Sequence, residues 1–394
     1  MMQRFGGMKG ITAIGGFNGT SRSFTANFAL AVALILGLLG FNLEPGLMRQ
    51  GWIRIHAEQT LRAMHNGNLN RDDIDALTAG YYEGLRKDEG TVWAPIERDD
   101  IRFTNDFRRY ELKPNLNRRY LAGMRVTNSL GLANPEYGID KPPHTRRIAV
   151  IGDSISLGPY GQDYIALLEN RLNRDNTTPE IQKYQILNFA VYGYTVLQMM
   201  DVVLEVAPKF HPDVYIITIT HLQAGKKYAS AGIHIARLES DGIDLKYEYL
   251  RQIAAQAKIR PTDSERLNVR KLAPYHLQIT QWALEQMKAS IAAQGAQMVI
   301  VLLPAPMPPD VIVESFDEIR PTVDSIGVPV IDLRDTFKDK DLEKLQVDYG
   351  VDIHPNALGH KMIYENLYRK IQQYPKFESS LFGSASRFQD SAAR

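Results

Sequence analysis

The residues best suited to chemistry stand in three short segments of the 394-residue chain. Gly152-Asp153-Ser154 follows an uncharged run, and a serine in such a turn can act as a nucleophile, although the same three residues also make plain turns. His354 stands in the sequence DIHPNALGH, where a histidine can serve as a base. Gly193 lies between them, and glycine permits close backbone approach. A serine, a base and a glycine loop together suit nucleophilic catalysis.

The surrounding residues predict the elements that hold these segments in place. The β-branched run 148–151 is typical of a strand buried on both faces of a parallel sheet, and ligands bind beyond the carboxyl ends of such strands. Strand and helix patterns then alternate, which favours a doubly wound, three-layer α/β fold with a mostly parallel sheet. We expect strands at 148–151, at the start of 186–195, and at 213–219, 297–303 and 328–333, with helices at 164–172, 195–206, 274–294 and 361–371.

Taken in chain order, the three segments resemble the SGNH hydrolases, also called the GDSL-like lipase or acylhydrolase family. The resemblance runs over residues 146–374. It implies Ser154 as the nucleophile, His354 as the general base, and Gly193 with the backbone N–H of Ser154 as oxyanion donors. Asp153 would then brace the turn by bonding nearby backbone N–H groups. No cofactor is implied.

The acid of the triad departs from the usual family spacing. The family places it three residues before the histidine, and Val351 holds that position here. Aspartate stands one residue later, at Asp352, and relatives with this shorter DxHPN spacing are familiar. We expect Asp352 to orient the imidazole of His354. Asp348 is the alternative if the loop is looser than its sequence indicates.

The oxyanion hole departs further. The family's third strand is followed by Gly-x-Asn-Asp, whose asparagine donates a hydrogen bond, but here the matching residue is Leu222, which cannot donate. Losing one such donor costs roughly 10²–10³ in rate. His221 and Gln223 are the candidate substitutes, although His221 also fits a strand-end residue satisfied by the backbone. The chain therefore has a substitute donor, a slow reaction or no reaction.

Metal and nucleic-acid chemistry are not indicated. His360 follows His354 by six residues, which is not the i, i+4 spacing that places two imidazoles on one helical face, so we expect His360 to cap or pack the final helix. The chain has no cysteine, which excludes disulfides and thiolate sites. With 46 Lys and Arg against 45 Asp and Glu, it also lacks the basic excess that nucleic-acid binding requires.

The amino end predicts a membrane anchor. Residues 24–43 are uncharged and mostly apolar, which is the length of a transmembrane helix, although a cleaved signal peptide or a buried helix would also be apolar. Charges around this span favour a cytoplasmic amino terminus and an outward-facing, periplasmic catalytic domain. The domain organisation that we expect is an N-terminal segment 1–23, a transmembrane helix 24–43, an appended lead-in subdomain and linker 44–145, a catalytic domain 146–374, and a flexible tail 375–394.

The function that we expect is that of a serine esterase or O-acyltransferase. Its substrate would be an acyl group, most simply acetyl, on an envelope or secreted glycan, and polysaccharide assembly proteins would be its partners. The mixed charges of residues 223–270 indicate a solvated face, or else a lid or acceptor platform. The alternative function is that of a non-catalytic binding or scaffold protein on the same fold, which the replacement by Leu222 favours.

Overall fold

The computed structural model describes residues 99–224, 230–350 and 352–373. Five parallel strands form its central sheet in the order β6-β5-β7-β8-β9. Their bounds are β5 Thr145–Ile151, β6 Lys183–Asn188, β7 Val214–Thr220, β8 Gln297–Leu303 and β9 Val330–Asp332. The mostly parallel sheet predicted from the sequence is therefore confirmed. The predicted segments 1–23, 24–43 and 375–394 lie outside the described residues.

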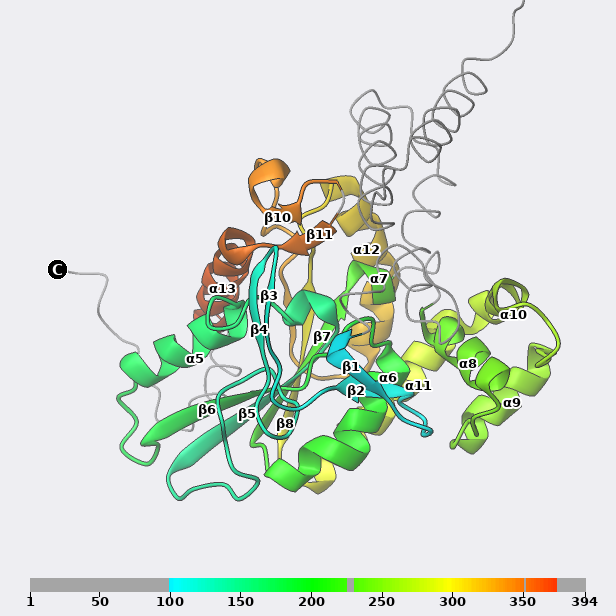
Figure 1. The fold of residues 1–394 in the computed structure, drawn as a ribbon, viewed down its shortest axis with the longest axis horizontal. Coiled ribbons are helices and arrows are strands. Elements are labelled where there is room, and N and C mark those ends of the chain that lie inside the picture. Colours follow the sequence, from blue (N-terminus) through cyan, green and yellow to red (C-terminus); the bar gives the residue numbers. More distant parts are fainter. Residues whose placement is uncertain (1–98, 225–229, 351, 374–394) are drawn as a thin grey trace, which may run out of the picture. The chain divides into compact units, whose positions relative to one another are not determined.

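Helices connect the strands and lie on both sides of the sheet. The helices α5 Tyr164–Arg174 and α13 Ala357–Gln372 pack together on one side, and Figure 1 shows α6, α11 and α12 on the other. These three span Val196–Asp201, His276–Ala293 and Pro309–Ser325. After α6 the helical path continues as a π-helical turn, Val202–Val206. The chain passes from β5 to β6 on one side of it and then crosses over to β7 on its other side. At such a reversal of strand order, ligands bind in the crevice beyond the carboxyl ends of the two strands, here β5 and β7.

The core consists of the sheet and the apolar faces of these helices. All seven residues of β7 are buried, and so are the last five residues of β5, Arg147 to Ile151. Arg147 was not expected inside the sheet. Its guanidinium donates to the carbonyls of Gly138, Ile139 and Asp140 at 2.6–3.1 Å, so it ties the segment before β5 to the sheet.

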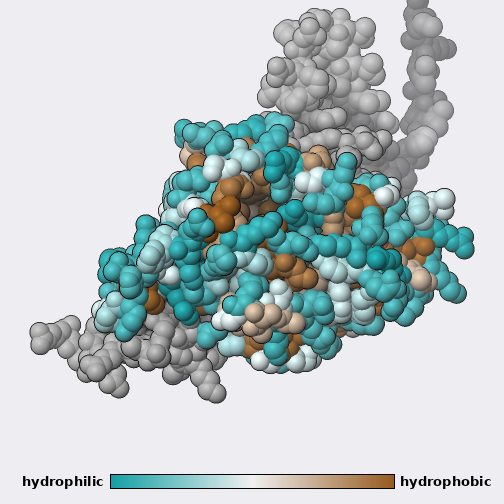
Figure 2. All heavy atoms as spheres, turned by 90° about the horizontal axis from the view of Figure 1, so that it is seen from below, coloured by the Kyte–Doolittle hydropathy of each residue, from teal (hydrophilic) through white to brown (hydrophobic). Residues whose placement is uncertain are grey.

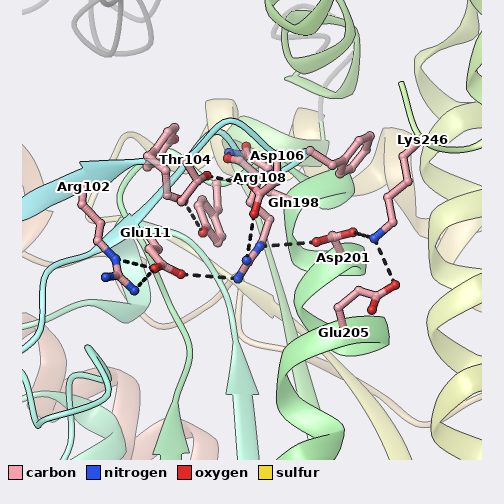
Figure 3. Close-up of polar contacts among 12 residues, drawn as sticks. Arg102, Thr104, Asp106, Arg108, Glu111, Gln198, Asp201, Glu205 and Lys246 are labelled. Carbon is pink, nitrogen blue, oxygen red and sulfur yellow. Dashed lines mark hydrogen bonds and ion pairs between the residues drawn. The ribbon is translucent and has the colours of Figure 1, made fainter. Parts of the chain in front are cut away.

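Two small antiparallel hairpins precede the sheet. They comprise β1 Ile101–Phe103 with β2 Tyr110–Leu112, and β3 Asn117–Tyr120 with β4 Gly123–Val126. Figure 3 shows the guanidinium of Arg108 between the carboxylates of Glu111 and Asp201, and Lys246 bonded to Asp201 in turn. Asp201 is the last residue of α6, so this chain of charges joins the first hairpin to a sheet helix.

In the described part of segment 223–270, most charged side chains are exposed while the apolar side chains of its helices are buried. The segment holds α7 His221–Ala224, α8 Ser230–Asp241, α9 Glu248–Gln256 and α10 Glu265–Leu272. Arg237, which we expected on the surface, is 4% exposed and pairs with Glu265 at 3.1 Å. The solvated-face prediction is thus wrong for Arg237, whereas Asp244, Glu248 and Arg251 are exposed as it expected. Asp241, at the end of α8, is exposed and pairs with Arg109 of the first hairpin.

The face of the described residues that is seen from below is mostly hydrophilic (Figure 2). Figure 2 shows small hydrophobic patches among polar side chains on the face seen from below. None of the described helices combines the length and the apolar character needed to span a bilayer. The last pair of strands, β10 Gln346–Asp348 and β11 Asp352–Pro355, is antiparallel and separate from the central sheet.

Candidate active site

Ser154 lies directly beyond β5, the second strand of the five-stranded sheet. The chain leaves β5 at Ile151 and forms a 3₁₀ turn at Ser154–Ser156, which the carboxylate of Asp153 caps by accepting the N–H of Ile155 at 3.0 Å. A side chain at Gly152 would collide with Thr218 of the neighbouring strand, so glycine is required there. The serine is buried at the carboxyl edge of the sheet, where the sequence placed it.

Asp153 braces this turn, as its residue type indicated. Its second carboxylate oxygen accepts the hydroxyl of Thr220 at 2.7 Å and an amide N–H of Gln223 at 3.2 Å. Burial raises the pKa of Asp153, against the opposing effect of these hydrogen bonds and of the charge of His354. Asp153 therefore links the end of β5 to the end of β7.

His354 reaches Ser154 from β11. Its Nε2 lies 2.8 Å from Oγ of Ser154, close enough to accept the hydroxyl proton. Its Nδ1 lies 2.5 Å from Oδ1 of Asp352, which also accepts the backbone N–H of His354 at 3.0 Å. Burial would raise the pKa of Asp352, but the charge and hydrogen bonds of His354 outweigh it and lower that pKa. Asp352 is therefore ionised beside the imidazole.

The strand geometry explains why the shorter acid spacing works. Residues two apart on a strand point to the same face, and Asp352 and His354 are two apart on β11. Asp348 is exposed on β10, where it lies opposite Asp352 in the strand register. The structure thus brings Asp352 to the imidazole, whereas Asp348 stands on the neighbouring strand.

Gly193 lies in the loop after β6, beside the turn of Ser154. The backbone N–H of Val191 donates to the carbonyl of Gly152 at 3.3 Å, so the two loops are directly bonded. Gly193 is buried and has a φ of 60°, in the left-handed region that favours glycine. This backbone turns sharply before Thr195, the N-cap of α6.

The two candidate substitutes for the missing asparagine differ in their surroundings. The amide nitrogen of Gln223 donates to Asp153 and to the carbonyl of Tyr194 at 2.9 Å, so it holds the two loops together. His221 begins α7 and is completely buried. Burial, with the nearby charge of His354, lowers the pKa of His221 to about 3, so its ring is neutral and offers one N–H donor. Because the amide of Gln223 is already bonded to Asp153 and Tyr194, His221 is the candidate that we test as a third donor.

His360 packs between the final helix and α5. Its Nδ1 accepts the backbone N–H of Tyr164 at 3.4 Å, and its ring stacks on that of Tyr164 with centroids 6.0 Å apart. Gly158 lies against the ring, where any side chain would collide with it. His360 therefore has the packing role that its spacing indicated. Sequence reasoning did not single out Thr220, Tyr192 or Arg125, which also border the two loops.

Comparisons with known proteins bear on the family of the chain. The sequence model of the GDSL-like Lipase/Acylhydrolase family matches residues 150–362. A comparison with curated protein sequences gave no match.

Several solved structures are similar to the chain. The lipase/acylhydrolase from Enterococcus faecalis shares 13% identity, with a TM-score of 0.36, over 58% of this chain and 96% of that one. The psychrotrophic esterase EstA from Pseudoalteromonas sp. shares 12% identity, with a TM-score of 0.36, over 59% and 99%. The acetylxylan esterase Axe2 from Geobacillus stearothermophilus, solved as a catalytic mutant, shares 14% identity, with a TM-score of 0.36, over 57% and 94%.

Proposed function

The chain belongs to the GDSL-like lipase/acylhydrolase family, and on that premise we propose that it is a serine-dependent enzyme acting on acyl esters. The observation that carries the proposal is the continuous contact from Ser154 through His354 to Asp352, with 2.8 Å and 2.5 Å between the polar atoms. A serine hydroxyl is a poor nucleophile until a neutral imidazole removes its proton.

The reaction uses these groups in turn. Oγ of Ser154 attacks the ester carbonyl while Nε2 of His354 takes its proton, and Asp352 stabilises the imidazolium that forms. The backbone N–H groups of Ser154 and Gly193 hold the negative oxygen of the tetrahedral intermediate. His354 then returns the proton to the leaving alcohol, and an acyl-Ser154 ester remains. Attack by water, with His354 again as the base, releases the acid and restores the serine.

The acceptor of the acyl group separates two forms of this proposal. If water attacks the acyl-serine, the enzyme is an esterase; if a sugar hydroxyl attacks, it is an O-acyltransferase. We propose an acyl group, most simply acetyl, on an envelope or secreted glycan. The support is the apolar segment 24–43, which would anchor the enzyme to the membrane with its catalytic domain in the periplasm, among polysaccharide assembly proteins. Mass analysis of the products from an acetylated donor, with and without an unacetylated glycan, distinguishes the two forms.

One observation favours a second function. Leu222 stands where the family has its oxyanion-hole asparagine, so a non-catalytic binding or scaffold protein of a polysaccharide system is the alternative. A serine-directed fluorophosphonate decides between them. The enzyme is labelled, and Ser154→Ala abolishes the labelling. Absence of labelling in the unaltered chain, together with no turnover of an aryl acetate, supports the binding protein.

A further inference from the structure

We propose that Arg125, in the second hairpin before the sheet, is a positioning residue that holds both backbone oxyanion donors in place. This inference rests on the proposed function. Arg125 stands on β4, about thirty residues before Ser154, and is 9% exposed. All three nitrogens of its guanidinium donate hydrogen bonds, and their acceptors belong to the two loops that carry Ser154 and Gly193.

The first loop is the one that begins at the nucleophile. Nη2 of Arg125 donates to the carbonyl of Leu157 at 2.6 Å, and Nη1 donates to that of Gly158 at 2.5 Å. The backbone N–H of Leu157 in turn donates to the carbonyl of Ser154 at 3.1 Å, closing the 3₁₀ turn. The guanidinium therefore fixes the end of the 3₁₀ turn. The conformation of this turn sets the direction of the backbone N–H of Ser154.

The second loop carries Gly193. Nε of Arg125 donates to the hydroxyl of Tyr192 at 3.0 Å, and its guanidinium carbon lies 5.4 Å from the centre of that ring. Tyr192 directly precedes Gly193, and its hydroxyl also donates to Asp100 at 3.2 Å. One side chain thus contacts both loops, and the planar fork of an arginine sets the distance between its acceptors.

The first hairpin also holds the Gly193 loop. The hydroxyl of Tyr110 on β2 donates to the carbonyl of Tyr192 at 2.9 Å, and the hydroxyl of Tyr194 donates to the carbonyl of Tyr110 at 2.7 Å. The neighbours of Gly193 on both sides are therefore bonded to the hairpins. The peptide of Gly193 has a left-handed φ that these contacts maintain.

This arrangement matters because an oxyanion hole works by pre-placed donors. Donors must lie about 2.7–3.1 Å from the developing oxyanion, and a displacement of about 1 Å can cost roughly 100-fold in rate. Arg125 contacts backbone and a tyrosine, so its effect on the reaction passes through the two loops. The two hairpins, although they precede the sheet in sequence, are on this argument part of the active site.

The test compares variants of the whole 394-residue chain on an aryl acetate. Active sites are counted by labelling to completion with a fluorophosphonate, so that kcat is expressed per competent site. Arg125→Ala should lower kcat roughly 10- to 100-fold with little change in KM, because the donors act in the transition state. Arg125→Lys should recover only part of the loss, since one ammonium cannot span three acceptors in a plane.

Two further variants isolate the effect. Tyr192→Phe keeps the ring beside Arg125 but removes the hydroxyl, and should lower kcat less than Arg125→Ala does. Arg119→Ala removes the same charge from an exposed position on β3 of the same hairpin, and should behave as the unaltered chain. If Arg125→Ala does not fold, Arg125→Lys and Tyr192→Phe carry the test.

The outcomes separate the inference from the proposed function. In one outcome, the Arg125 and Tyr192 variants keep the kcat per labelled site of the unaltered chain, and only the number of labelled sites or the Tm falls. Arg125 then has a purely structural role, which overturns the inference but leaves the proposed enzymatic function intact. An unaltered chain with neither labelling nor turnover overturns the proposed function and this inference with it.

Discussion

Nε2 of His354 lies 2.8 Å from Oγ of Ser154, although 200 residues separate them in the sequence. The serine follows strand β5 of the central sheet, and the histidine stands on β11, outside that sheet. The relationship therefore depends on the packing of the carboxyl-terminal part of the chain against the crevice. At this distance a proton can pass directly between the two side chains.

Because Ser154 and His354 act as one unit, replacing either residue should cost about as much activity as replacing both. Ser154→Ala and His354→Ala should each remove nearly all turnover of an aryl acetate, and the double variant should be hardly worse, as for members of a triad. The kcat of the three variants checks this. Losses that add up in the double variant would show that the two residues act separately.

The acid of the site should be Asp352. Asp352→Asn should lower kcat by roughly 10²–10⁴ while folding is retained, because the imidazole loses the carboxylate that orients it and stabilises its charged form. Asp348→Asn is the matched control on the neighbouring strand and should leave kcat unchanged. Circular dichroism confirms folding in both. The reverse pattern would transfer the role to Asp348.

A third oxyanion donor is expected at His221. His221→Ala should lower kcat by roughly 10²–10³ with little change in KM, because the interaction matures only in the transition state. The comparison of kcat and KM on one ester checks it. Unchanged turnover would leave the two backbone donors alone, and Leu222→Asn should then raise the activity of a weak enzyme.

Acid should destabilise the fold through buried histidines, of which His234 is one. Burial, with the charge of Arg109, lowers the pKa of His234 to about 3, below the value of about 6.5 in an unfolded chain. The unfolded state therefore binds the proton first, and stability is lost as the pH falls from about 6.5 toward about 3.

His234→Gln should make this loss shallower by up to about 1.4 kcal/mol per pH unit. Glutamine can still donate to the carbonyl of Phe107, which the Nε2 of His234 contacts at 2.8 Å, but it does not titrate. Urea unfolding at several pH values gives the slope for both proteins. Identical slopes would mean that His234 is already protonated in the folded state or that it opens to solvent.

The apolar segment 24–43 should place the site outside the cytoplasm. A topology reporter fused after Arg394 should be active only on the outer side, and the protein should stay with the membrane through a high-salt wash. Reporter activity in the cytoplasm would reverse the proposed orientation.

Local patterns in the sequence were sufficient to predict most strands of the central sheet. The predicted strand 297–303 coincides with β8 Gln297–Leu303, and 213–219 differs from β7 Val214–Thr220 by one residue. Short β-branched apolar runs of this kind are typical of parallel strands, because both faces of such a strand are buried. The helix α12 Pro309–Ser325 was missed, since prolines normally end helices; here Pro309 lies in the first turn and Pro321 is accommodated inside.

In the candidate site, too, some features follow from the sequence and others only from the tertiary structure. The types and spacing of Ser154, His354 and Asp352 were readable from the sequence, because each role needs one kind of side chain and because strand period places Asp352 and His354 on one face. The choice of Asp352 over Asp348 required the register of β10 and β11. No periodicity connects Arg125 to Gly158 and Tyr192, since a contact between distant segments arises only when hydrophobic burial has packed the hairpins onto the sheet domain.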